Sequence, residues 1–162
     1  MPTPTQTLKN IRLVISGDVR AWMTKVRTLV GEGADIHVLD NYKGEGSIVK
    51  AYMISGADVD TVLDVSRFLF GMGVRATPEL FVDALLTNVR FADAVMKASN
   101  NTINVNTLDI YGESSNDWAL RNTLFKKHPE AIKYLISAGL RTSTKNISLD
   151  DIIRIASKNF PR

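Results

Sequence analysis

Residues 118–140 carry the sequence WALRNTLFKKHPEAIKYLISAGL, which predicts two short helices joined by a tight turn. The first helix is expected over about residues 117–125. Pro129 is expected to open the second helix and Gly139 to close it, because proline suits a first helical position and glycine a helix end. One helix pair cannot bury its apolar side alone, so further pairs must stack against it.

A short phrase recurs along the chain and supplies those neighbours. Residues 33–40 read GADIHVLD and residues 102–109 read TINVNTLD, while weaker echoes begin at Gly73 and Gly139. The four echoes start at residues 33, 73, 102 and 139, a mean spacing of about 35 residues. A period of this size indicates a stacked repeat protein, which moves function from a catalytic pocket to a binding surface.

Apolar spacing and capping residues predict short helices throughout the chain. Thr77-Pro78-Glu79 is a clear start, since it offers an N-cap, a proline at the first position and an acidic first turn. Helices are also expected over residues 8–16, 19–30, 47–54, 91–98 and from about 148, and from Asp58 or Asp60 to Phe70.

The connections and ends of the chain complete the predicted architecture. Residues 35–39 are expected to be extended and to run into a turn at residues 40–44. Residues 1–7 are polar and proline-bearing and are interpreted as a flexible N-terminal tail. The pattern therefore predicts an all-α fold, with one domain over residues 8–162 and no central sheet.

The helix pair at residues 118–140 resembles one ankyrin repeat, a unit of about 33 residues. Family positions are matched by Leu120, His128, Glu130, Ile132, Leu135, Ile136 and Gly139, and by the preceding Asp109-x-x-Gly112. Residues 33–36, residues 63–70 and Thr77-Pro78 are similar to the closing phrase, second helix and opening dipeptide of the family. Arg121 replaces the usual His and Trp118-Ala119 the usual Thr-Pro, as in degenerate viral and bacterial copies.

The resemblance implies an ankyrin-repeat solenoid of about four helix-turn-helix repeats with a C-terminal capping helix. It also implies a non-enzymatic module that binds a partner protein through fingertips and a concave face, by occlusion or scaffolding. An inhibitor of a host or defence protein, encoded by a virus or phage, is one biology that fits. The predicted contact residues are His37, Asn41, Tyr42, Lys43, Arg75, Thr77, Asp109, Tyr111, Trp118, Arg121 and Lys145.

Several aromatic residues leave two interpretations open. Tyr42 and Tyr111 each follow an aspartate by two residues, which places them at equivalent fingertips. A tyrosine there can contact a partner, to which it offers a large area with a polar end, or can lie back on its own turn. Trp118 can pack between repeats or line the concave groove as an anchor. Core positions are expected for Trp22, Phe68 and Phe81.

Composition limits the other classes of function. The chain has no cysteine, so disulfides, thiolate metal sites and cysteine nucleophiles are excluded, and a cytoplasmic location fits (that of the host cell if the chain is viral). The two histidines lack metal-ligand spacing, and no nucleotide-binding fingerprint is complete. No apolar run reaches the ~20 residues that span a bilayer. No enzyme, cofactor, metal site or membrane association is therefore expected.

Nucleic-acid binding is the alternative function. The net charge of +3, from 20 Lys+Arg against 17 Asp+Glu, is a small excess and disfavours nucleic acid as the main ligand. A basic face could still form from Lys43, Lys50, Arg75, Arg121, Lys126, Lys127 and Lys145. Binding by such a face would fall steeply with salt, whereas aromatic anchors predict a milder salt effect. A monomer and a homodimer both remain open.

Overall fold

The computed structural model describes residues 2–105, 109–110, 113–114 and 129–139, and most of these residues are helical. The elements are α1 (Pro4–Lys9), α2 (Val19–Gly31), the 3-10 segment η1 (Ile36–Gly44), α3 (Ile48–Met53), α4 (Val59–Met72), α5 (Pro78–Leu85), α6 (Val89–Ala98), β1 (Asp109–Ile110), β2 (Glu113–Ser114) and α8 (Pro129–Ser137). The two strands form an antiparallel pair in which Asp109 faces Ser114. The predicted all-α class is thus confirmed, apart from this two-residue ladder.

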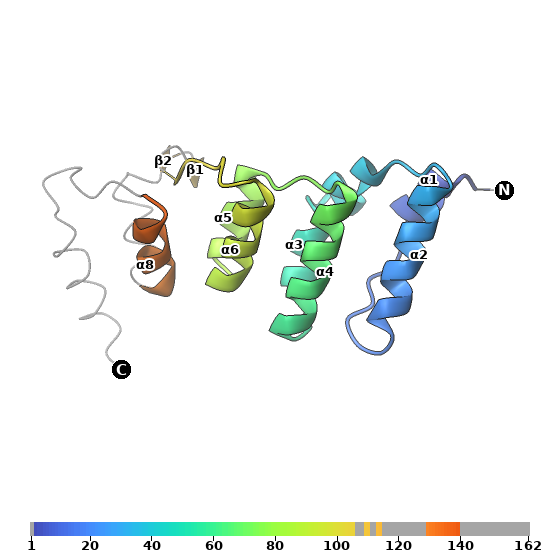
Figure 1. Cartoon of the computed structure of the whole chain (residues 1–162), viewed down its shortest axis with the longest axis horizontal. Helices are drawn as coiled ribbons and strands as arrows, with labels where there is room; N and C mark the ends of the chain where they lie inside the picture. The colour runs from blue at the N-terminus through green and yellow to red at the C-terminus, as the bar shows by residue number, and fades with distance from the viewer. Residues whose placement is uncertain (1, 106–108, 111–112, 115–128, 140–162) are drawn as a thin grey trace, which may run out of the picture.

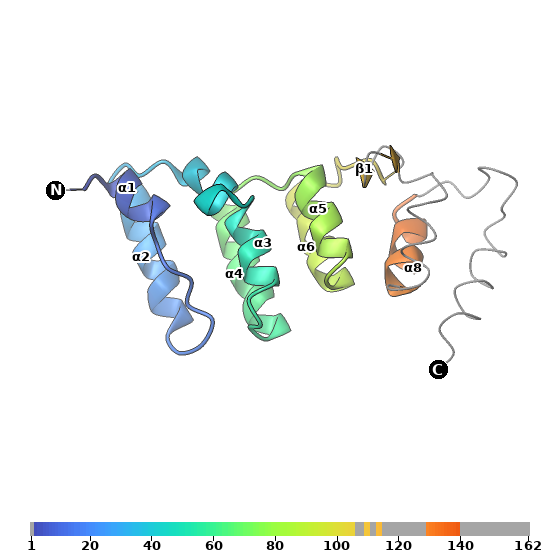
Figure 2. The same cartoon turned by 180° about the vertical axis from the view of Figure 1, so that it is seen from behind.

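The helices stand in a row of pairs along the long axis of the molecule (Figures 1 and 2). Within each pair the first helix packs on the second, so that α1 contacts α2, α3 contacts α4, and α5 contacts α6. Between pairs, α2 contacts α4, α4 contacts α6, α6 contacts α8, and α3 contacts α5. The segment η1 and the connection after α4 lie along one edge of the row, at the top of Figure 1.

Each helix of the three pairs begins at a side chain that accepts a hydrogen bond from a free N–H group of its first turn. The caps of the first helices are Thr3, Ser47 and Thr77, and those of the second helices are Asp18, Asp58 and Asn88. Thr3-Pro4 therefore repeats the Thr77-Pro78 start, and Gln6 completes a capping box with Thr3. Residues 4–7, expected in a flexible tail, belong to α1.

The second helices end in one common way. The N–H of Ala34 donates to the carbonyl of Leu29, and the pairs Val74–Leu69 and Asn101–Met96 repeat this bond. The residue just before each donor has a left-handed backbone, with φ values of 103° at Gly33, 116° at Gly73 and 58° at Asn100. This is the Schellman arrangement, which requires a left-handed residue after the helix. The helix end of the third pair thus lies at Asn100, two residues before Thr102, where the sequence that resembles residues 33–40 begins.

Two predictions of local structure are wrong. Helix α1 ends at Lys9, so residues 10–16 do not continue it as expected. Aromatic side chains hydrogen-bond this backbone in place of a helical partner. Trp22 Nε1 donates to the carbonyl of Arg12 at 2.8 Å, and Tyr42 OH donates to the carbonyl of Ile11. The N–H of Val14 donates to Tyr52 OH at 3.1 Å. Residues 36–39 form 3-10 turns instead of an extended segment, because Asp35 Oδ1 accepts the N–H of His37 and starts a turn.

The core is one continuous cluster that lies both within the helix pairs and between adjacent pairs. Its largest fully buried side chains are Tyr52, Phe81, Leu8, Leu39, Ile48, Leu69 and Leu85. Trp22 meets Tyr52 edge to face, with 5.3 Å between ring centres. Trp22 and Phe81 are buried as predicted, whereas Phe68 is half-buried. Burial raises the pKa of Tyr52 to about 12, although the hydrogen bond from Val14 opposes this shift.

Candidate functional site

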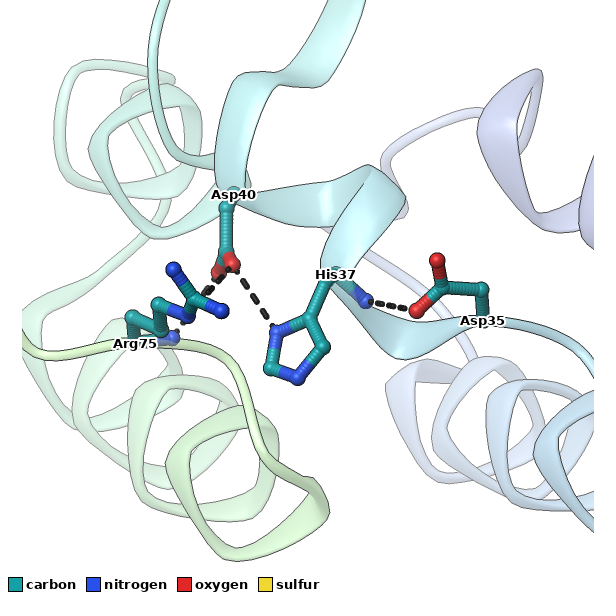
Figure 3. A network of polar contacts seen from close by, with 4 residues as sticks. All are labelled: Asp35, His37, Asp40 and Arg75. Carbon is teal, nitrogen blue, oxygen red and sulfur yellow. Dashed lines mark hydrogen bonds and ion pairs between the residues drawn. The ribbon is translucent and has the colours of Figure 1, made fainter.

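Asp40 joins two successive finger loops, which are residues 35–46 and 73–77. Its Oδ1 accepts the backbone N–H of Arg75 at 2.9 Å, and its Oδ2 lies 3.0 Å from Nδ1 of His37. Oδ2 also lies 3.5 Å from Nε of Arg75. Figure 3 shows the imidazole and the guanidinium approaching the carboxylate from two sides. One carboxylate on η1 therefore fixes both loops and orients two predicted contact residues.

His37 and Arg75 present most of this cluster to solvent. Their side chains are 46% and 68% exposed, whereas that of Asp40 is 23% exposed. The carboxylate is thus partly covered by the two side chains that it holds. The guanidinium of Arg75 donates hydrogen bonds and suits carbonyl and carboxylate groups of a partner, and the imidazole of His37 adds a second polar group beside it.

Lys43 stands at the tip of a tight turn in the first finger loop. The N–H of Glu45 donates to the carbonyl of Tyr42 at 3.0 Å, and Lys43 and Gly44 have φ values of 53° and 77°. Positive φ at both central positions is typical of a type I′ turn, which favours Asn and Gly at the place that Lys43 occupies. Asn41 closes the turn by accepting the N–H of Gly46 at 3.2 Å. The amide oxygen of Asn41 is therefore engaged within the loop, and Lys43 is its exposed cation.

Tyr42 does not lie on the contact surface that the sequence predicted. Its side chain is buried, at 7% exposure, and its hydroxyl donates to the carbonyl of Ile11. The ring turns inward under Lys43, whose Nζ lies 5.1 Å from the ring centre. Thr77 is likewise structural, since its hydroxyl accepts the N–H of Leu80 at 3.1 Å and caps α5.

The remaining predicted residues lie after residue 105, where the structure describes only short segments. Asp109 is part of β1. Tyr111, Trp118, Arg121 and Lys145 lie outside the described residues, as do Lys126 and Lys127 of the alternative basic face. Of the cations of that face that are described, Arg75 contacts Asp40 and Lys50 contacts Asp83 at 3.8 Å. Two of the three described cations of the basic face are therefore close to carboxylates, and Lys43 is the exception.

A groove beside the turn was missed by sequence reasoning. It has a volume of about 590 Å³ and lies between the connection after α1, the turn at Lys43, and α3. Arg12 and Leu13 line one side, Lys43 another, and Lys50, Ala51 and Ile54 a third. We call it the Ile54 groove, because Ile54 is 68% exposed at its edge.

The Ile54 groove could not be predicted from the sequence, because its lining residues come from separate segments of the chain. Three segments far apart in the sequence meet there, and none of them contains a motif. The one usable signal was Ile54, an apolar residue at the very end of a predicted helix.

Asp83 lies beside Lys50 at the edge of this region. Burial raises the pKa of Asp83 above its ordinary value, although Lys50 opposes this shift.

Comparisons of the chain with protein-family models, with curated proteins and with solved structures gave no match. Within the described residues, no group of three or more His, Asp or Glu side chains could hold a metal ion. No helix in that part of the chain has both the length and the apolar character needed to cross a membrane. Function is therefore inferred from the finger loops and the Ile54 groove themselves.

Proposed function

We propose that the chain is a non-enzymatic protein-binding module of the ankyrin-repeat type, which acts by occluding or scaffolding a partner protein. Hydrogen bonds between neighbouring pairs support the repeat assignment, because they join residues about one repeat apart in sequence. Asp35 bonds Thr5 across 30 residues, Arg75 bonds Asp40 across 35, and Val14 bonds Tyr52 across 38. The fourth repeat would contribute α8 as its second helix.

The observation that carries the proposal is the carboxylate of Asp40 holding His37 and Arg75 on adjacent finger loops. A surface held in place before binding loses less conformational freedom on association. Here the backbone of both loops and the two exposed side chains are tied to one group. Such a preorganised, solvent-facing surface suits recognition of another macromolecule.

Protein is favoured over nucleic acid as that macromolecule. A nucleic-acid surface needs several cations free to neutralise phosphates. Arg75 and Lys50 are each close to a carboxylate, and the nearby Ile54 groove exposes an apolar side chain. Binding to a protein would therefore depend on these finger and groove side chains and only moderately on salt.

Affinity capture from a lysate of the source cell tests the proposal. The full chain serves as bait beside His37→Ala/Arg75→Ala, which removes two exposed side chains but leaves the backbone N–H of Arg75 for Asp40. Arg90→Ala/Lys97→Ala is the control, since both residues are exposed cations on the second helix α6. We expect a stoichiometric protein with the parent and the control and its loss with the finger variant. Recovery of only nuclease-sensitive material would contradict the proposal.

A further inference from the structure

We propose that the Ile54 groove takes an acidic, partly apolar segment of the partner protein. An apolar side chain of the segment would lie against Leu13 and Ile54, and its carboxylates would meet Arg12 and Lys43. This inference rests on the proposed function and names the chemistry of the partner. The apolar surface of the groove, its charge and its rigidity support this occupant.

The apolar surface is exposed where the fold does not need it. Ile54 follows α3 and is 68% exposed, which makes it the most exposed large apolar side chain in the described part of the chain. Leu13, half-buried, and Ala51 of α3 continue the apolar lining. Apolar surface next to a polar rim is typical of protein-binding sites. A phosphodiester backbone would gain nothing from these side chains.

The charge of the groove selects the partner. No carboxylate of the described residues lies within ion-pair distance of Arg12 or Lys43, whereas Lys50 contacts Asp83 at 3.8 Å. Glu45 is the one carboxylate among the groove residues. Two cations that form no ion pair with a described carboxylate therefore flank the apolar surface. A segment that brings carboxylates beside an apolar residue complements this arrangement, and a basic segment would be repelled.

The groove is also held in shape before any ligand arrives. Side chains of Trp22, Tyr42 and Tyr52 hydrogen-bond the backbone that carries Arg12 and Leu13. Lys43 occupies a left-handed position, with φ of 53°, where Asn or Gly would be less strained. Backbone strain of this kind is concentrated at functional sites. The turn therefore keeps a cation at the edge of the groove at some conformational cost.

Selection of a displayed library of random peptides on the immobilised full chain tests the inference. We expect the enriched peptides to combine Asp or Glu with Leu, Ile or Phe. A fluorescein-labelled consensus peptide then gives affinities by fluorescence polarisation. Ile54→Asn should weaken its binding about tenfold, and Arg12→Ala or Lys43→Asn about three- to tenfold. Asn suits the left-handed position, so Lys43→Asn removes the charge without disturbing the turn.

Matched controls separate the groove from the general surface. Ile15 is an exposed isoleucine, at 42%, that does not line the groove, so Ile15→Asn should leave the affinity unchanged. Arg90 on α6 is the corresponding control for Arg12. Enrichment of basic peptides, no enrichment at all, or equal losses with Ile15→Asn and Ile54→Asn would overturn the inference. Competition of a single-stranded oligonucleotide with the peptide would overturn it as well.

The two proposals fail in different ways. Lysate capture could depend on His37 and Arg75 while the Ile54→Asn chain captures the same protein equally well. That result would contradict only the groove inference. Acidic peptides could bind through Ile54 and Arg12 while His37→Ala/Arg75→Ala captures the partner as well as the parent does. That result would contradict only the assignment of the finger loops as a contact surface.

Discussion

Asp40 accepts the backbone N–H of Arg75 at 2.9 Å across 35 residues of sequence. The same separation of about 35 residues is the mean spacing of the phrase that recurs in the chain. Because Gly33 and Gly73 end equivalent helices, Arg75 corresponds to Asp35 of the preceding unit. The carboxylate of Asp40 thus binds the backbone at the start of the next finger loop. The finger loops are therefore linked to each other as well as to their own helices.

Replacing Asp40 should weaken this link measurably. Asp40→Ala removes the acceptor for the N–H of Arg75 and the partner of His37, so the free energy of unfolding should fall by about 1 kcal/mol. Asp40→Asn keeps an amide oxygen for the N–H of Arg75 and should lose less. Urea unfolding followed by circular dichroism measures both. Parent-like stability of Asp40→Ala would show that the link contributes nothing.

Tyr52→Phe should lower the free energy of unfolding by about 1 kcal/mol near neutral pH, because the N–H of Val14 loses its acceptor. Burial raises the pKa of Tyr52 from its ordinary value of 10.0 to about 12, so the native state holds this proton more tightly than the unfolded chain. The resulting stability is fully present below about pH 10 and is lost as pH rises towards about 12.

The phenylalanine variant lacks this titration. The stability advantage of the parent over Tyr52→Phe should therefore shrink as pH rises from about 10 towards about 12. All other ionisable groups are common to both proteins, so their contributions cancel in the difference. Urea unfolding of the pair at several pH values measures it, and a difference independent of pH would contradict the prediction.

Ser66→Ala should stabilise the protein. The side chain is 1% exposed, and its hydroxyl has no hydrogen-bond partner in the described part of the chain, so a polar group is buried without compensation. Alanine removes that group and is a better helix former, which should add about 1 kcal/mol to the free energy of unfolding. Ser55→Ala is the control, since Ser55 Oγ donates to the carbonyl of Tyr52 at 2.7 Å. A gain for Ser55→Ala as large as that for Ser66→Ala would refute the explanation.

Gly73→Ala and Gly31→Ala should have opposite effects. Gly73 has φ of 116°, and a Cβ there would lie 3.1 Å from Cγ2 of Ile36, so alanine should cost about 1–2 kcal/mol. Gly31 is the last residue of α2, and a Cβ there meets nothing within 4 Å, so alanine should add about 0.5–1 kcal/mol. Thermal unfolding of the two variants gives the signs, and tolerance of alanine at position 73 would argue against the left-handed helix end.

The elements that sequence predicted well depend on neighbouring residues. Ser47, Asp58 and Thr77 cap the helices that follow them, and Gly73 ends α4, because each interaction spans only a few residues. The start of α1 was missed because Thr3-Pro4 looks like a polar tail unless it is compared with Thr77-Pro78.

The features that sequence could not predict depend on distant residues. Residues 10–16 leave the helix because aromatic side chains from other elements bind their backbone. Tyr42 points inward, where its hydroxyl donates a hydrogen bond to the carbonyl of Ile11, 31 residues earlier. Lys43 was identified as a site residue, but the partners that make it part of a groove come from two other segments.

A map of amide chemical shifts tests the central claim most directly. The full chain would be labelled with nitrogen-15 and titrated with the protein captured from lysate, and the shifts assigned. We expect the changes to concentrate in the finger loops at residues 35–46 and 73–77 and around Arg12, Leu13 and Ile54. Changes confined to the second helices α2, α4 and α6, with the finger loops unaltered, would contradict it.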